Sequence, residues 1–395
     1  MSIKPTELRS ASVRPALPPR TGGLPIVGAL PAFARRPFDL LREAREQHGD
    51  IFTLDLGVTR WVILNHPRQA DYMLREHSQN YRKGSGLWDT IRELMGNGLV
   101  VSEGDFWLRH RRMIQPQFHR KRLAGLADAM VAATIESLEF WETAARTGRP
   151  CDALANFAAV TICVIAGALL GQGLRGVDIE RVSEQMAFVM DYLIMGAVTS
   201  ALPAWLPIPG ARRFRYAIRE LDQVVMRIIT EERQALEPSN SMLGMLLHMA
   251  DADTGEQMTD AQLHDEVMTF FTAGYETTSL ALAWTIHFLT QYPAVMEKVR
   301  AEIDHTLGGR PPAFADLAGL NYTRMVIQES MRLCSPSWLL PRTAIADDEI
   351  DGFTIPAGTN VVALTYGIHH TWQFEAASPS PKYRLCAAQG EQSSP

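Results

Sequence analysis

The chain has 395 residues, of which 46% are hydrophobic and 21% charged, and its net charge is −6. This composition is that of a folded globular protein and excludes a disordered chain, which would have fewer apolar residues and a larger net charge. The acidic balance argues against nucleic acid as the main partner, because phosphate binding needs a concentrated basic face.

The cysteines and the N-terminal segment indicate a cytoplasmic protein. Four cysteines without a CxxC pair make no disulfide framework in a chain of this length. The N-terminal segment lacks the apolar stretch of a signal peptide, so we expect neither a signal nor a membrane anchor. The most apolar run, residues 153–170, is shorter than the ~20 residues that cross a bilayer and is interpreted as a buried core helix.

The N-terminal part of the chain mixes short elements of both kinds. Prolines and glycines in residues 18–28 predict an irregular lead-in, and a short helix follows over 37–47. Residues 51–56 and 61–64 are rich in β-formers and predict a hairpin. Pro67 suits the first turn of the next helix.

The middle of the chain is predicted to be helical. From about residue 105 to 333, apolar residues recur at spacings of three and four, which predicts helices over 107–113, 122–147, 153–169, 179–195, 211–235, 260–291 and 294–307. Two breaks interrupt this pattern: a proline-rich apolar loop over 196–210 and a polar loop over 237–259.

Strands are predicted again near the C-terminus, over 349–355 and 360–365 with a turn between them. The sequence therefore predicts a mainly α protein with one domain over residues 1–370 and a small strand-rich module built from both ends of the chain. Residues 371–395 differ abruptly in composition, and we expect a divergent, disordered tail there.

The segment FFTAGYETTS, residues 270–279, is an unusual sequence for the middle of a long helix. A glycine there costs ~1 kcal/mol relative to alanine, and threonine hydroxyls can bond the carbonyl four residues earlier. Ala273 and Gly274 leave a flat groove for a planar group, and Glu276 and Thr277 place an acid and an alcohol beside it, as a proton relay needs. The alternative is a helix kink with a capped polar pocket.

Two further pairs have weaker signals. Trp107 and Arg111 lie four residues apart on one helix face, and an indole N–H and a guanidinium together suit a carboxylate. The alternative is a solvated basic helix with the tryptophan as a core anchor. Glu329 and Arg332 are three apart, which permits an ion pair, and the alternative is an ordinary surface pair.

These motifs in this order resemble those of the cytochrome P-450 family of haem-thiolate monooxygenases, over roughly residues 18–370. Trp107-x-x-x-Arg111 is similar to the family's W-x-x-x-R, which binds a haem propionate, and residues 273–278 match its oxygen groove. Glu329 and Arg332 match the family's structural ion pair. Arg342 resembles the arginine that reaches the other propionate.

The resemblance implies a fold, a cofactor and a reaction. The fold would be a large helical body around a long central helix, with a small β module. The cofactor would be haem, and one oxygen atom of O2 would be inserted into a lipophilic small molecule. Thr277 would hold and protonate the bound oxygen, Glu276 would relay protons, and Ala273 and Gly274 would make room for O2.

Electrons would come from an external ferredoxin or flavodoxin with its reductase, docking on the basic run of residues 109–122. Solubility alone is the alternative explanation of those charges. An apolar substrate lining would come from Met190, Leu193, Met195 and Leu202, unless these are ordinary core residues.

The sequence departs from the family pattern after residue 370. The family takes its thiolate ligand from a loop reading F-x-x-G-x-x-x-C-x-G, and the surroundings of Cys386 differ from it at every fixed position: Pro379, Lys382 and Ala388. We therefore assign no metal ligand and interpret Cys386 as a free thiol. Cys163 and Cys334 are interpreted as small core residues.

Two alternatives therefore remain open. The chain is a haem-dependent monooxygenase, or it is a truncated, inactive remnant without the haem loop and the final helix. In the second case we expect Glu329 and Arg332 to be left partly unpaired and the melting temperature to fall, because their third partner in the family comes from the lost segment.

Overall fold

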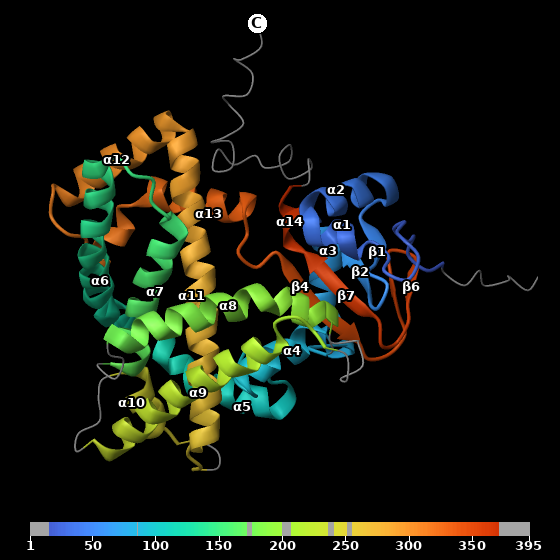
Figure 1. Ribbon diagram of the computed structural model, residues 1–395, viewed down its shortest axis with the longest axis horizontal. Coiled ribbons are helices and arrows are strands. Elements are labelled where there is room, and N and C mark those ends of the chain that lie inside the picture. Colours follow the sequence, from blue (N-terminus) through green and yellow to red (C-terminus); the bar gives the residue numbers. More distant parts are fainter. Residues whose placement is uncertain are drawn as a thin grey trace, which may run out of the picture. The chain divides into compact units, whose positions relative to one another are not determined.

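The computed structural model describes residues 16–84, 86–171, 176–199, 207–235, 241–250 and 255–370 (Figure 1). The chain divides into two compact units. The smaller comprises Met1–Arg82 and Pro341–Leu364, and the larger comprises Lys83–Leu340 and Thr365–Pro395. The predicted strand-rich module from both ends of the chain is therefore confirmed. The tail over 371–395 lies outside the described residues.

The smaller unit is built on a five-stranded sheet with the order β1-β2-β7-β4-β3. Its strands are β1 (Ile51–Asp55), β2 (Arg60–Leu64), β7 (Asn360–Leu364), β4 (Leu339–Ala344) and β3 (Tyr81–Arg82). β1 and β2 form the predicted antiparallel hairpin, whereas β2 and β7 are parallel, with Trp61 opposite Asn360. This parallel pairing joins the N-terminal part of the chain to residues almost 300 positions later.

The predicted segment 349–355 is a hairpin rather than one strand. β5 (Asp348–Ile350) and β6 (Phe353–Ile355) pair antiparallel around Asp351 and Gly352, whose φ angles are 49° and 80°. Positive φ at both central residues is the geometry of a tight two-residue turn, which an Asp-Gly pair favours. The sequence analysis missed this Asp-Gly signal.

Short helices accompany the sheet. They are α1 (Leu30–Arg35), α2 (Pro37–His48) and α3 (Pro67–Asp71), and α3 continues as a π-helical turn over Tyr72–Glu76. Pro37 and Pro67 occupy the first helical position, where the missing N–H of proline has no partner to lose. The predicted helix over 37–47 and the predicted helix start at Pro67 are confirmed.

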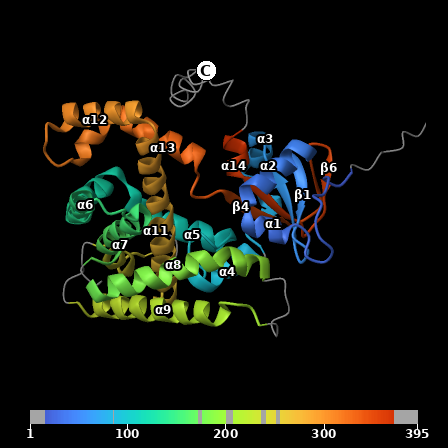
Figure 2. The same cartoon turned by 45° about the horizontal axis from the view of Figure 1, so that its top comes forward.

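The larger unit is helical, and α11 is its longest helix (Figures 1 and 2). Its helices are α4 (Leu87–Met95), α5 (Gly104–Ile114), α6 (Arg120–Thr147), α7 (Ala153–Leu170), α8 (Gly176–Thr199), α9 (Ala211–Gln234), α10 (Met242–Leu247), α11 (Asp260–Gln291), α12 (Pro293–Leu307), α13 (Asn321–Leu333) and α14 (Thr365–His369). All seven helices predicted from the periodicity are present.

Both predicted breaks are partly wrong. The polar loop expected over 237–259 contains α10, whose six residues are almost all buried, and α8 extends to Thr199 into the expected apolar loop. Six residues are too few to display a helical period, and the core contacts of α10 stabilise it instead. Helix α4, with nine residues, was also missed.

The core of the larger unit is formed by α7, α8, α9, α10 and α11 together with α4 and α5. Of the described helices, α7 alone is long and apolar enough to cross a membrane, and 33% of it is buried. An apolar core helix has the same composition, and the contacts of α7 with α11 and α6 favour that interpretation.

Candidate active site

The segment expected to carry the chemistry lies in the middle of α11. The helix begins with a capping box, in which the Thr259 hydroxyl accepts the Gln262 N–H and Gln262 Oε1 accepts the Thr259 N–H at 2.8 Å. Two orphan donors are thereby satisfied and the start of the helix is fixed. Residues 273–278 follow about four turns later.

Thr277 bonds back along its own helix as the sequence predicted. Its hydroxyl donates to the Ala273 carbonyl over 2.7 Å, and the side chain is exposed. Such a bond tilts the carbonyl away from the helical ladder and locally opens the helix. Because the hydroxyl oxygen keeps its lone pairs, it can also accept a hydrogen bond from a neighbouring donor.

Gly274 faces another helix and not an open groove. A Cβ atom built there would stand 2.8 Å from Cδ1 of Ile165 on α7. Beside it, the Thr161 hydroxyl of α7 donates to the Tyr275 carbonyl at 3.3 Å. The expectation that Gly274 helps to form a flat groove is therefore wrong: its missing side chain lets α7 and α11 approach closely.

Glu276 is half-buried, and burial raises the pKa of its carboxyl group, with a further contribution from the negative charge of Asp191 on α8. A raised pKa keeps more of this acid protonated near neutral pH than an exposed glutamate would be.

Trp107 and Arg111 are brought together on α5. The Arg111 guanidinium lies over the Trp107 indole, 5.1 Å from the ring centroid. Arg111 is exposed and has no carboxylate partner among the residues that the structure describes. The stack holds the guanidinium in place without occupying its N–H donors, so the pair suits a carboxylate ligand.

Arg342 belongs to the smaller unit, where it is half-buried on β4 and donates to the Pro341 carbonyl at 2.8 Å. All the other predicted site residues lie in the larger unit. In the described part of the chain, no group of three or more His, Cys, Asp or Glu side chains is arranged to hold a metal ion.

Glu329 and Arg332 form a bidentate ion pair on α13, with both N–O distances at 2.8 Å and both side chains largely buried. Arg332 also donates to the His369 carbonyl of α14 at 2.7 Å. The expectation that this pair is left partly unpaired is therefore wrong, because the guanidinium nitrogen that does not face Glu329 donates to a backbone carbonyl.

The described cysteines do not suit a thiolate ligand. Cys163 and Cys334 are half-buried, and burial raises the pKa of both thiols, with Glu136 adding to the effect at Cys163. Neither cysteine lies in a stretch that reads F-x-x-G-x-x-x-C-x-G, the loop that supplies the thiolate in the family that the sequence resembles. Cys151 is exposed, and Cys386 lies outside the described residues.

The residues proposed to line a substrate site are divided. Met190 is half-buried and packs against the core, whereas Met195 is 48% exposed. Leu193 is half-buried, and Leu202 lies outside the described residues. For Met190 the structure favours the core alternative.

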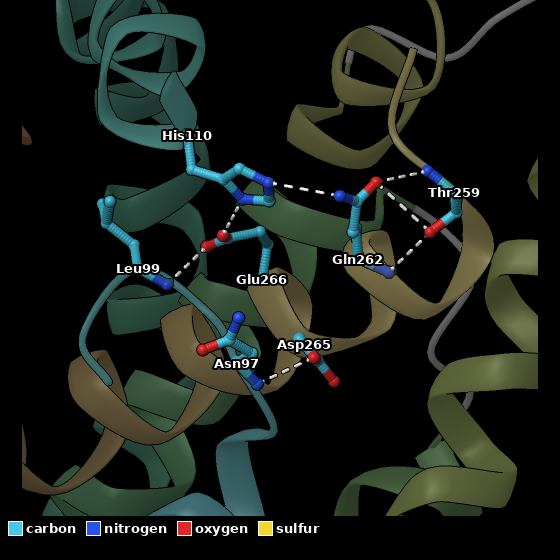
Figure 3. Close-up of polar contacts among 7 residues, drawn as sticks. All are labelled: Asn97, Leu99, His110, Thr259, Gln262, Asp265 and Glu266. Carbon is cyan, nitrogen blue, oxygen red and sulfur yellow. Dashed lines mark hydrogen bonds and ion pairs between the residues drawn. The ribbon is translucent and has the colours of Figure 1, made fainter. Parts of the chain in front are cut away.

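Sequence reasoning missed a polar network between α5 and the first turns of α11. Its centre is a contact between His110 and the fully buried Glu266 (Figure 3). The sequence offered two signals: a histidine next to the Trp107–Arg111 pair, and an acidic pair early in the long helix. His110 and Glu266 are, however, 156 positions apart. Only the folded structure brings them together.

Comparisons of the sequence with known proteins give three matches over most of the chain. A sequence profile described as Cytochrome P450 matches residues 18–376. Cyclooctat-9-en-7-ol 5-monooxygenase of Streptomyces melanosporofaciens is 35% identical over 350 residues, which are 88% of this chain and 75% of that protein. Pentalenene oxygenase of Streptomyces avermitilis is 31% identical over 358 residues, 90% of this chain and 78% of that protein.

Proposed function

Since the chain belongs to the cytochrome P450 family of monooxygenases, we propose that it uses haem to insert one oxygen atom of O2 into a lipophilic small molecule. The match of the family profile to residues 18–376 carries this proposal. The mainly helical fold with a small β module agrees with it.

The described residues can supply partners for the propionates of a haem, but not the axial ligand of its iron. Trp107 and Arg111 would hold one propionate, since their donors are pre-oriented and Arg111 has no carboxylate partner in the described part of the chain. No described cysteine suits the thiolate, so we assign no axial ligand.

The haem would supply the activation of O2, and the protein would supply position and protons. Ala273 leaves space on α11 because its side chain is a single methyl group. The Thr277 hydroxyl would turn its single proton from the Ala273 carbonyl toward the site of O2, and Glu276 would supply further protons there from its raised-pKa carboxyl.

The substrate is proposed to be a cyclic, mostly hydrocarbon molecule of the terpene kind. Two relatives are named for pentalenene and for cyclooctat-9-en-7-ol, an alkene and an unsaturated alcohol. Such molecules offer few polar groups, so an apolar lining would bind them chiefly by excluding water.

Electrons are proposed to come from a separate ferredoxin or flavodoxin with its reductase. The exposed arginines at the end of α5 and the start of α6, Arg112 and Arg120, would attract an acidic partner.

Isotope labelling tests the proposed reaction. The purified chain, loaded with haem, is incubated with a ferredoxin, its reductase, NADPH, a cyclic terpene alkene and 18O2. We expect a product that contains one 18O atom. A product labelled from H2 18O instead, or no oxygenated product with any of a panel of terpenes, would contradict the proposal.

A second candidate is a non-catalytic family member that keeps the scaffold. The observation behind it is that the residues around Cys386 differ at every fixed position from the family's F-x-x-G-x-x-x-C-x-G loop. The absorption difference spectrum of the reduced, CO-treated protein separates the two. A red-shifted band from thiolate ligation supports the monooxygenase, whereas its absence in a haem-loaded sample supports the second candidate.

A further inference from the structure

Two consecutive carboxylates on α11 hold the loop between α4 and α5. Asp265 Oδ2 accepts the backbone N–H of Asn97 at 2.8 Å, and Glu266 Oε2 accepts that of Leu99 at 3.1 Å (Figure 3). Neighbouring residues on a helix point about 100° apart, so the two carboxylates accept hydrogen bonds from the loop in two different directions. The loop is therefore fixed to α11 through its backbone.

Two glycines allow this close approach. A Cβ atom at Gly98 would stand 2.1 Å from the Thr269 hydroxyl oxygen and 2.5 Å from the Asp265 carbonyl oxygen, and one at Gly96 would overlap the Asp265 carboxylate. Gly96 also has φ +56°, which other residues rarely adopt. The Gly-Asn-Gly sequence is thus required by the contact with α11.

Glu266 extends the same contact to α5. Its other oxygen, Oε1, lies 2.8 Å from Nδ1 of His110, and the two residues are 0% and 1% exposed. His110 is additionally held by the ring of Phe106, whose centroid is 4.0 Å away. A fully buried carboxylate is stable only when its oxygens are hydrogen-bonded, and here both are.

The surrounding hydrogen bonds determine which nitrogen of His110 carries the proton. Gln262 Oε1 accepts the Thr259 N–H, so the Gln262 NH2 group is the side that faces His110 Nε2, at 3.5 Å. An NH2 group only donates, and therefore Nε2 must accept. The ring proton then lies on Nδ1 and is donated to Glu266, as Figure 3 shows for the heavy atoms.

We propose that Glu266 and His110 are positioning residues that fix α5 against α11 in the orientation in which Trp107 and Arg111 receive the carboxylate of a haem. His110 lies three residues after Trp107 and one before Arg111, so its bond to Glu266 sets the rotation of α5 at that point. The proposal rests on the proposed function for the identity of the ligand.

The test uses the full chain and a pair of matched variants. Glu266→Gln keeps the shape and the bond to Leu99 but presents an NH2 group to Nδ1, so His110 faces a donor on both sides. Asp105→Asn is the control, since Asp105 is an exposed carboxylate on α5 and the substitution removes the same single charge at a position outside the network. Haemin affinity is measured by absorption titration, and the His110 ring and Trp107 indole nitrogens by 15N NMR.

We expect wild-type His110 to carry its proton on Nδ1, and Glu266→Gln to shift the Trp107 indole signal and weaken haemin binding by about tenfold. The control should leave the Trp107 indole signal in place and change the haemin affinity by less than about twofold. In the double variant Glu266→Gln/Gln262→Glu, a carboxylate faces Nε2 instead. The ring should then carry its proton on Nε2, with haemin affinity restored to within about threefold of the wild type.

A Trp107 signal and a haemin affinity unchanged in Glu266→Gln would overturn the inference, as would a wild-type ring protonated on Nε2. The NMR readouts need no haem. If the wild-type chain bound no haemin while the indole signal still responded to Glu266→Gln, the positioning role would stand and the proposed function would fail.

Discussion

At the scale of single residues, the α11 motif combines two demands that a sequence pattern cannot separate. Thr277 and Glu276 carry the polar groups suited to proton transfer, whereas Gly274 and the carbonyl of Tyr275 serve the contact with α7. The residue types of the motif were predictable. The faces that they present were not, because Ile165 and Thr161 lie more than 100 positions away in the sequence.

The contact at Gly274 predicts that Gly274→Ala lowers the unfolding free energy of the wild type but raises that of a variant with a smaller residue at position 165. Gly274→Ala gains helix propensity but places its methyl group 2.8 Å from Cδ1 of Ile165, so we expect a net loss of about 1 kcal/mol in unfolding free energy. In an Ile165→Val background, which lacks Cδ1, the same substitution should stabilise by about 0.5–1 kcal/mol. Urea unfolding of the four proteins measures both effects. Equal effects in the two backgrounds would contradict the packing role of Gly274.

His264 predicts a pH dependence of stability. Burial lowers its pKa, but hydrogen bonds to Asp222 of α9 and to Asp265 outweigh burial and raise the pKa to about 9, from an ordinary value of 6.5. A raised folded-state pKa stabilises the protein fully below pH 6.5, and this contribution is lost as the pH rises through 9. Because Asp222 is 37% exposed, screening reduces the contribution to about 2 kcal/mol.

Urea unfolding at pH 6 and at pH 10, with His264→Gln as the reference, measures this contribution. The wild type should exceed the variant by about 2 kcal/mol more at pH 6 than at pH 10. An identical pH profile for the two proteins would mean that His264 is not held between the carboxylates.

At the scale of elements, long periodic helices were predictable and short ones were not. Helices such as α9 and α11 repeat an apolar face over many turns, so their existence and type follow from spacing. The β5–β6 hairpin could have been predicted from its Asp351-Gly352 turn. Helix α10, with six residues, depends instead on core contacts that its local sequence does not contain. The Glu266–His110 contact between α5 and α11 belongs to the same class.

The ion pair between Glu329 and Arg332 predicts a strong asymmetry between single and double substitutions. Glu329→Leu leaves a largely buried guanidinium without its carboxylate and should cost about 3–5 kcal/mol in unfolding free energy. The double variant Glu329→Leu/Arg332→Leu removes both charges, and we expect it to be more stable than Glu329→Leu alone. Thermal and urea unfolding measure the difference. A double variant less stable than the single one would show that the guanidinium is tolerated unpaired.

At the scale of the whole molecule, the sequence predicted a helical body and a strand-rich module from both chain ends, and the structure has both as compact units. The motif order along the chain, rather than any single motif, made the family recognisable. The sequence could not show that Arg342 belongs to a different unit from Trp107 and Arg111, since assignment to a unit depends on contacts of the folded chain.

The proposed electron transfer predicts a dependence on salt. An acidic partner that docks on the exposed arginines is attracted by charge, and salt shortens the distance over which charges attract each other. Raising the ionic strength from 0.05 to 0.5 M should therefore slow the reduction of the haem-loaded chain by about tenfold. Stopped-flow absorption measures the rate. Arg112→Glu/Arg120→Glu should lower the rate at low salt, and a salt-independent rate would contradict docking by charge.

The central claim is that this chain binds haem through the Trp107–Arg111 pair of α5. Titration of the purified chain with haemin, followed by Soret absorption, tests it most directly. We predict saturation at one haemin per chain. The variant Trp107→Phe/Arg111→Leu lacks the indole and guanidinium donors, and we expect it to bind haemin at least about tenfold more weakly. No saturable Soret band in the wild type, or an equal affinity in the variant, would contradict the claim.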